Sequence, residues 1–185
     1  MDELKRRLGE DRRFFSYFHP ALEDEPIIFV QVALTNGLGK SIQEITKPRS
    51  DGDQKYDTAT FYSISNCQEG LSRVTLGNFL IKRVVFEIQE ELPNIKHFGT
   101  LSPIPGFRDW FSYLEDVKIK NILGDVSIES ISFLKSSDLK VGDPRIVSNK
   151  VAITKLVAHY LMNEKNHKQL PINDVCRFHL GNGAI

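Results

Sequence analysis

This sequence has few cysteines and no long apolar runs. Its two cysteines, Cys67 and Cys176, lie far apart and lack the spacing of a metal site. Thiols of this kind are typical of a reducing compartment, so we expect both to be reduced. No stretch reaches the roughly 18 consecutive apolar residues that a membrane span needs. The sequence therefore predicts neither a disulfide framework, nor a metal centre, nor a membrane segment.

An excess of charge of one sign is also missing. Lysine plus arginine and aspartate plus glutamate balance at 24 each. A neutral total gives no support for a nucleic-acid or membrane-surface role. The first residues, MDELKRRLGEDRR, are polar and mixed in charge, unlike a signal or transit peptide. We therefore expect a soluble intracellular protein of the cytoplasm, mitochondrion or peroxisome, with no nucleic-acid or membrane partner.

What the chain does contain is the composition of a globular domain. Its 185 residues are 41% hydrophobic and 26% charged, which fits one domain with a sizeable core. Residues 12–20 read as an aromatic-rich extended segment, followed by a turn over 21–26. The β-branched runs at 27–35 and 58–65 predict two buried strands. Between them, the polar residues 36–57, interrupted by glycine and proline, predict a surface loop.

The strongest local pattern lies in residues 76–93. Apolar side chains recur there at helical spacing, and charged residues occupy the other face, which predicts a helix packed on a sheet. Residues 95–102 then return as a short strand. A strand–helix–strand unit with a short turn into its helix predicts an α/β fold with at least one parallel strand pair. The repeating apolar positions are Leu80, Ile81, Val84, Val85, Ile88 and Leu92.

The second half of the chain gives weaker signals. Residues 111–150 have poor periodicity and predict one or two helices, whereas 150–165 predict an amphipathic helix. The segment 170–184 is bounded by proline and glycine, so we expect a loop with a short extended piece. Between these halves, Pro103 and Pro105 end the strand that leads to Ser102, because proline restricts the backbone and lacks an N–H.

A glycine-bearing turn joins the second buried strand to the predicted helix. Gly70 and Gly77 flank Arg73 in this turn, and the free N–H groups of a helix N-terminus favour an anion such as a pyrophosphate. The spacing matches neither the Walker A pattern nor the dinucleotide fingerprint. It resembles the turn with which acetyltransferase-type folds hold the pyrophosphate of coenzyme A. The alternative is that the glycines only form a tight strand-to-helix connection.

Five segments in a fixed order resemble the catalytic domain of the malonyl-CoA decarboxylase family. The resemblance covers residues 13–110 and resumes at 150–184, while 111–149 correspond to a variable insertion. LSPIPGF is the most specific part. The five segments are SYFHPALEDEPIIFVQVALT, FYSISNCQEGL, LGNFLIKRVV, ELPNIKHFGTLSPIPGF and FHLGNGA.

The resemblance implies a GNAT-like α/β fold, a mixed sheet flanked by helices. Residues 1–185 would be part of the catalytic domain, lacking its C-terminal end and the helical N-terminal domain through which the family oligomerises. A homo-oligomer is therefore expected for the full-length protein. The implied reaction converts malonyl-CoA to acetyl-CoA and carbon dioxide without a metal or prosthetic group.

The resemblance also implies the site residues. His179 is the expected proton donor to the carbanion, and Ser102 binds the malonyl carboxylate by a hydrogen bond or relays the proton. Arg73 stands where the family usually has a glycine, which bears on coenzyme affinity. The coenzyme-binding loop corresponds to Ser72, Arg73, Val74, Thr75, Leu76, Gly77 and Asn78.

Other interpretations remain open from the residues alone. Beside a proline, Ser102 has the character of a turn serine, and His179 between two apolar residues that of a structural histidine. A GNAT-type N-acyltransferase would use the same turn but needs an amine acceptor. An inactive coenzyme-A-binding fragment is the third possibility. Ser63 and Ser65 fit either an acyl pocket or ordinary strand packing.

Overall fold

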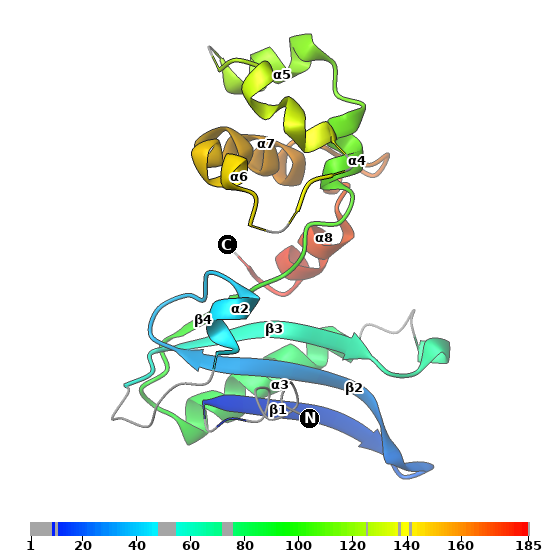
Figure 1. Cartoon of the computed structure of the whole chain (residues 1–185). Helices are drawn as coiled ribbons and strands as arrows, with labels where there is room; N and C mark the ends of the chain where they lie inside the picture. The colour runs from blue at the N-terminus through cyan, green and yellow to red at the C-terminus, as the bar shows by residue number, and fades with distance from the viewer. Residues whose placement is uncertain are drawn as a thin grey trace. The chain divides into compact units, whose positions relative to one another are not determined.

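The computed structural model describes residues 9, 11–47, 55–71, 76–124, 126–136, 138–140 and 142–184. The chain forms two compact units, Met1–Ser102 and Pro103–Ile185. The division falls between the predicted catalytic serine and the first proline of LSPIPGF. The first unit holds the sheet and the second is helical (Figure 1).

The first unit is built on a four-stranded mixed sheet of order β1-β2-β3-β4. β1, β2 and β3 pair in antiparallel fashion, and β3 and β4 are parallel, which confirms the predicted mixed α/β sheet. The predicted turn over 21–26 is wrong in length: β2 already begins at Leu22, which pairs with His19, so only Pro20 and Ala21 turn. The strands are β1 (Arg12–His19), β2 (Leu22–Thr35), β3 (Thr58–Asn66) and β4 (His97–Thr100).

Helix α3 (Leu76–Glu91) confirms the predicted amphipathic helix and packs against β1, β2 and β3. Its buried positions recur every three or four residues along one face of the helix, with Leu80 and Ile81 side by side: Gly77, Leu80, Ile81, Val84 and Ile88. The described part of the predicted surface loop contains a short helix, α2 (Ile42–Ile45), whose N-cap Ser41 accepts a hydrogen bond from the Glu44 amide. Ile45 of α2 packs on Ala33 and Tyr62 of the sheet. Helices thus lie on both faces of the central strands, which explains their nearly unbroken apolar runs.

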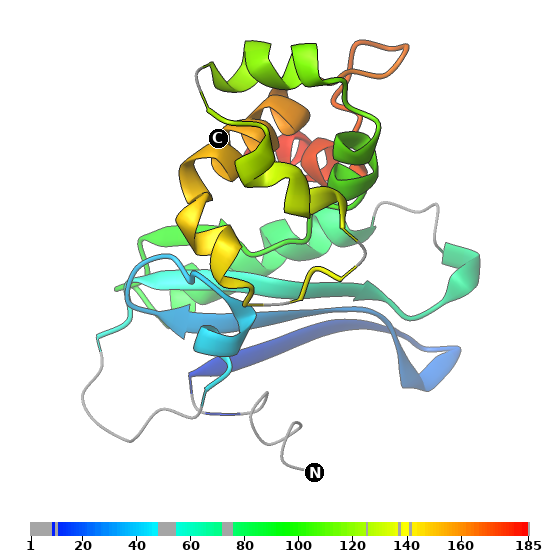
Figure 2. The ribbon, with the colours of Figure 1, turned by 45° about the horizontal axis from the view of Figure 1, so that its top comes forward.

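The second unit is made of helices around one core (Figure 2). The predicted helix at 150–165 is confirmed as α7, and α5 packs against it. Residues 111–149 hold the rest of α4, then α5, the 3-10 helix η2 and α6. The elements are α4 (Phe107–Ser112), α5 (Asp116–Leu123), η2 (Glu129–Lys135), α6 (Pro144–Ser148), α7 (Lys150–Met162) and α8 (Asp174–Gly181). The fully buried core side chains are Phe111, Ile119, Ile131 and Leu156.

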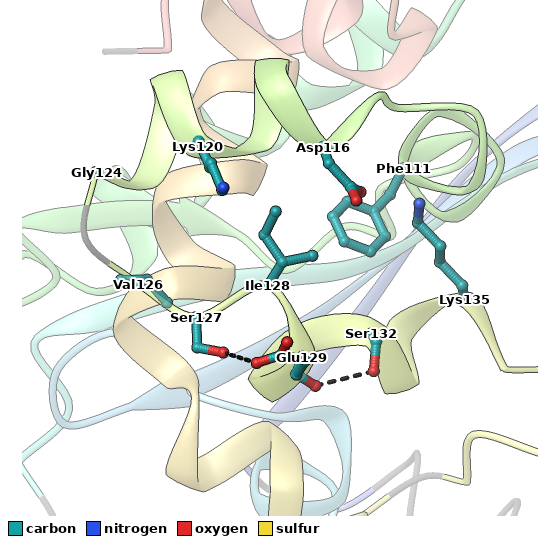
Figure 3. Close-up of a pocket in the computed structure, with 10 residues that line it drawn as sticks. All are labelled: Phe111, Asp116, Lys120, Gly124, Val126, Ser127, Ile128, Glu129, Ser132 and Lys135. Carbon is teal, nitrogen blue, oxygen red and sulfur yellow. Dashed lines mark hydrogen bonds between the residues drawn. The ribbon is translucent and has the colours of Figure 1, made fainter.

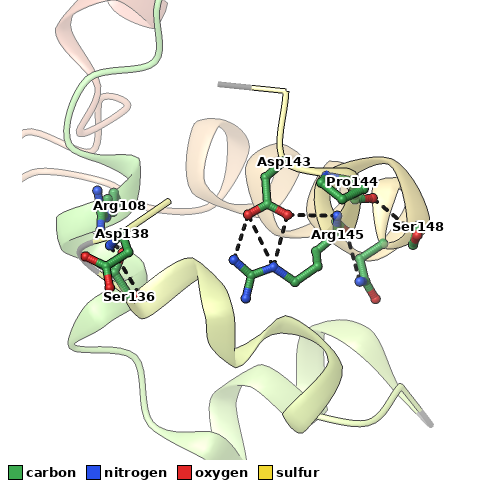
Figure 4. Close-up of polar contacts among 8 residues, drawn as sticks. Arg108, Ser136, Asp138, Asp143, Pro144, Arg145 and Ser148 are labelled. Atoms are coloured by element: carbon green, nitrogen blue, oxygen red, sulfur yellow. Dashed lines mark hydrogen bonds and ion pairs between the residues drawn. The ribbon is translucent and has the colours of Figure 1, made fainter. Parts of the chain in front are cut away.

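The short helix α6 begins at a capping carboxylate. Asp143 accepts a hydrogen bond from the Arg145 amide at 2.9 Å, and the Arg145 guanidinium contacts the same carboxylate at 2.6 Å (Figure 4). These contacts lower the pKa of Asp143 from 3.8 to about 2. Pro144 occupies the first turn, where its missing N–H costs nothing.

The prediction of a loop over 170–184 is wrong for residues 174–181, which are helical. Only Pro171 pairs in extended fashion, in an isolated bridge with Lys165, and the residues that follow form α8. Asn173 starts this helix as its N-cap, with its side chain accepting a hydrogen bond from the Cys176 amide at 2.7 Å. Proline just ahead of a capped N-terminus is compatible with a helix start, so the flanking Pro171 does not prevent it.

Candidate active site

The candidate site of the first unit lies at the edge of the sheet where β4 separates from β3. β4 pairs with β3 only from Thr58 to Phe61, while β3 continues to Asn66. The last contact is the Leu101 amide, which donates to the Phe61 carbonyl at 2.8 Å. Ser102 follows at once. Among the described residues, no strand pairs with this side of β3 beyond Phe61.

Ser102 and the start of α3 belong to the same edge of the sheet. β3 and β4 are parallel, so their carboxyl ends point the same way. β3 leads through the 3-10 helix η1 (Glu69–Leu71) into α3, and β4 leads into Ser102. Ligands of open α/β sheets bind outside the carboxyl ends of the strands, so this edge suits a ligand that spans from α3 to Ser102.

Only part of the predicted coenzyme loop can be placed. Leu76, Gly77 and Asn78 form the first turn of α3, and Gly77 is buried. The first N–H groups of a helix have no partner within it and carry the positive end of its dipole. Predicted loop residues 72–75, Arg73 included, lie outside the described residues.

The segment that follows Ser102 is held firmly within the second unit. Gly106 adopts a left-handed conformation, with φ of 76°, and caps α4. The Pro105 carbonyl accepts two hydrogen bonds, one from Tyr160 Oη at 3.0 Å and one from Asn173 Nδ2 at 2.8 Å. Both lone pairs of this carbonyl are therefore used, and the turn is fixed to α7 and to the start of α8.

His179 lies on α8 of the second unit. Its ring is half-buried and meets the ring of Phe178 edge to face, with centroids 5.2 Å apart. Burial lowers the pKa of His179 below its usual value, because a charged imidazole loses its hydration there. The His179 carbonyl accepts the amides of Asn182 and Ala184, so α8 ends within a turn of this residue.

The structure groups the predicted residues by unit. Ser102 and the described residues of the coenzyme loop, Leu76 to Asn78, belong to the first unit, and His179 belongs to the second. That Ser102 and His179 form one site stays a prediction. Sequence reasoning missed Asn173, Tyr160 and Gly106. For Asn173 a signal existed, since asparagine before an aspartate is a common helix start.

The second unit also has a cavity of about 760 Å³ between α5 and η2 (Figure 3). Its lining includes two lysines, Lys120 and Lys135, and two acids, Asp116 and Glu129. Ser127 donates to Glu129 across 2.6 Å at the rim. Neither Ser102 nor His179 lines this cavity. None of the described helices is long and apolar enough to cross a membrane.

The whole chain, residues 1–185, matches the family model described as malonyl-CoA decarboxylase C-terminal domain. It is 39% identical to mitochondrial malonyl-CoA decarboxylase of the goose Anser anser anser and 37% identical to that of Rattus norvegicus. The alignments cover 98% and 99% of this chain but 40% and 42% of those proteins. The chain thus spans about two fifths of the length of these relatives.

Solved structures give the same assignment. Crystal structures of malonyl-CoA decarboxylase from Rhodopseudomonas palustris and Agrobacterium vitis superpose with TM-scores of 0.81 and 0.78, at 40% and 39% identity. Each superposition covers 99% of this chain, and 43% and 46% of the respective structures. The mixed sheet with flanking helices agrees with the GNAT-like fold expected for it. The chain belongs to the malonyl-CoA decarboxylase family and corresponds to its C-terminal domain.

Proposed function

We propose that this chain is the catalytic region of a carboxy-lyase that converts malonyl-CoA to acetyl-CoA and carbon dioxide in fatty acid metabolism. The observation that carries the proposal is the family match over residues 1–185. The position of Ser102, directly after the point where β4 leaves β3, supports it from the structure. The proposal assigns this activity to a full-length protein of which this chain would be the catalytic part.

Substrate binding is assigned to the carboxyl edge of the sheet. The pyrophosphate of coenzyme A would bind residues 72–78 at the start of α3, where the positive end of the helix dipole favours an anion. The uncovered stretch of β3, residues 62–66, offers backbone groups to the amides of an extended pantetheine arm. This arrangement would deliver the malonyl group toward Ser102.

The proposed reaction removes the carboxylate of the malonyl group and adds a proton to the carbon that carried it. The bond between the malonyl carboxylate and the α-carbon breaks, carbon dioxide leaves, and the electron pair moves onto the thioester carbonyl as an enolate. His179 then gives a proton to the α-carbon, which yields acetyl-CoA. Ser102 orients the carboxylate by a hydrogen bond or passes on the proton. No prosthetic group enters this scheme, because the thioester itself accepts the electron pair.

Release of carbon dioxide from malonyl-CoA by the full-length protein tests the proposal. His179→Ala should lower kcat by about 100-fold or more, the usual contribution of a positioned acid. His167→Ala is the matched control, since His167 is exposed on a connecting segment, and should leave the rate unchanged. A rate that survives His179→Ala, or acyl transfer to an amine without carbon dioxide release, would contradict the proposal.

The proposed partners are malonyl-CoA, acetyl-CoA and further copies of the full-length chain. Light scattering on the full-length protein tests the homo-oligomer. Because the goose and rat relatives are named mitochondrial, the mitochondrion is the favoured compartment. Cell fractionation followed by detection of the protein distinguishes it from the cytoplasm and the peroxisome.

A further inference from the structure

We infer that Asn173 is a positioning residue of this reaction: its side-chain amide ties the segment after Ser102 to the helix that carries His179. The inference rests on the proposed function and adds to it a residue that touches neither substrate nor product. Both contacts that carry it lie within the second unit, between Pro105, Asn173 and Cys176.

Asn173 is 3% exposed and uses both ends of its amide. Oδ1 accepts the Cys176 amide at 2.7 Å, and Nδ2 donates to the Pro105 carbonyl at 2.8 Å. These partners fix the orientation of the amide. In the reversed orientation Nδ2 would face the Cys176 N–H and Oδ1 would face the Pro105 carbonyl, and neither pair can form a hydrogen bond. One buried group therefore starts α8 and holds a carbonyl far back in the sequence.

The anchored carbonyl is close to Ser102 along the chain. Pro105 is the third residue after Ser102, so their α-carbons are separated by about 11 Å at most. Pro103 and Pro105 have restricted backbones, and each restricts the residue before it. In the proposed role, this restricted segment passes a displacement of the Pro105 carbonyl on to Ser102.

The distance along the chain from Asn173 to His179 is also short. His179 is the sixth residue after Asn173, which is about 9 Å along the axis of α8. Because α8 is a regular helix, the position of its first turn determines where His179 lies. Asn173 thus joins two segments, each of which carries one of the two proposed catalytic residues. A misplacement of about 1 Å at a reacting group is enough to lower a rate by about 100-fold.

The two halves of the amide have separable tasks. Aspartate caps a helix as well as asparagine does, because capping uses only an oxygen acceptor. The donor to Pro105 is not needed for the cap. Asn173→Asp therefore keeps the start of α8 and removes the link to the Ser102 segment, and Asn173→Ser does so with an uncharged, shorter side chain.

The matched control is Asn149→Asp. Asn149 lies in the same unit and its Nδ2 donates to the Arg145 carbonyl at 3.0 Å, away from Pro105. In the full-length protein with malonyl-CoA, we expect Asn173→Asp and Asn173→Ser to lower kcat by about 10- to 100-fold. In the Asn173 variants KM should change by less than about threefold, because only the geometry of the transition state is altered. Asn149→Asp should change neither kcat nor KM.

A double variant separates positioning from general structure. If Asn173 acts through Ser102, Asn173→Asp should cost less than about threefold in kcat when Ser102→Ala is already present. Full cost in that background, an unchanged kcat, or a rise in KM alone would overturn the inference. If Asn173→Asp fails to fold, Asn173→Ser is judged by the same criteria.

The proposed function can fail separately. It fails if the wild-type protein releases no carbon dioxide or if His179→Ala keeps full activity. The role of Asn173 fails alone if the wild type is active, His179→Ala is impaired and both Asn173 variants match the wild type.

Discussion

Gly106 and Tyr160 lie so close that no side chain fits between them. A Cβ placed on Gly106 would be 2.8 Å from Tyr160 Oη, and the φ of Gly106 is 76°. Two separate effects, steric contact and left-handed backbone, therefore require glycine at this position. The hydroxyl that would be struck is the one that donates to the Pro105 carbonyl.

Gly106→Ala should destabilise the protein by more than the backbone effect alone. A left-handed alanine costs about 1–2 kcal/mol, and the contact with Tyr160 adds to this. Gly124→Ala is the matched control, because Gly124 has a φ of 72° and open space where its Cβ would lie. Thermal unfolding should show a larger loss of stability for Gly106→Ala than for Gly124→Ala. Adding Tyr160→Phe to Gly106→Ala should recover part of that stability. Equal losses for the two glycine variants would contradict the steric contact.

Tyr160→Phe should remove one of the two donors to Pro105 and leave the ring packing intact. A neutral hydrogen bond of this kind contributes about 1 kcal/mol to the free energy of unfolding. Denaturant unfolding measures that loss. Tyr113→Phe removes a hydroxyl from a side chain that is 89% exposed, and should have no effect. A loss equal in both variants would show that the Tyr160–Pro105 bond is not formed in solution.

The activity should fall as the pH rises through the pKa of His179. Protonated imidazole is the acid in the proposed step, and burial holds the pKa of the free enzyme below 6.5. Malonyl-CoA places a carboxylate nearby, which raises that pKa by favouring the charged imidazole. The falling limb of kcat should therefore lie at higher pH than that of kcat/KM, which reports the free enzyme. Coincident limbs, or a rate that increases with pH, would argue against His179 as the acid.

Acid should remove the contribution of the Asp143–Arg145 pair to stability. The pKa of Asp143 is about 2 in the folded protein against 3.8 for the free side chain, so its contribution is complete above 3.8 and is lost as the pH falls toward 2. Asp143→Asn should be less stable than the wild type at neutral pH, and the difference should shrink over that interval. Arg145→Gln should behave in the same way. A difference that stays constant with pH would exclude the ion pair as its cause.

The sheet and α3 were predictable because their signals are local. Apolar runs such as residues 27–35 record burial on both faces, and the spacing of Leu80, Val84 and Ile88 records one helical face. α8 was missed because its eight residues are too few to show a period, because Pro171 lies shortly before it, and because its last residue is Gly181. Its start depends on one hydrogen bond, from the Cys176 amide to the Asn173 side chain, and a single bond leaves no periodic pattern in the sequence.

Part of the candidate site was predictable for the same reason. The prolines after Ser102 show from the sequence alone that a strand stops there. The bond from Asn173 to Pro105 joins residues that are 68 positions apart, and no local pattern records such a contact. The Pro105-Gly106 pair is typical of a turn, but the steric part of the requirement for glycine comes from Tyr160 on a distant helix and leaves no local pattern.

The register between β3 and β4 shows why prolines occur where they do. Every second residue of a strand turns its N–H toward the same neighbour, and the Leu101 amide already faces β3. The next two amides that would close the sheet along Ser63–Asn66 belong to positions 103 and 105. Both are proline and have no hydrogen to donate. The spacing of two in Pro-Ile-Pro removes the donors on the side of β3, so β4 cannot lengthen into the opening that the substrate is proposed to enter.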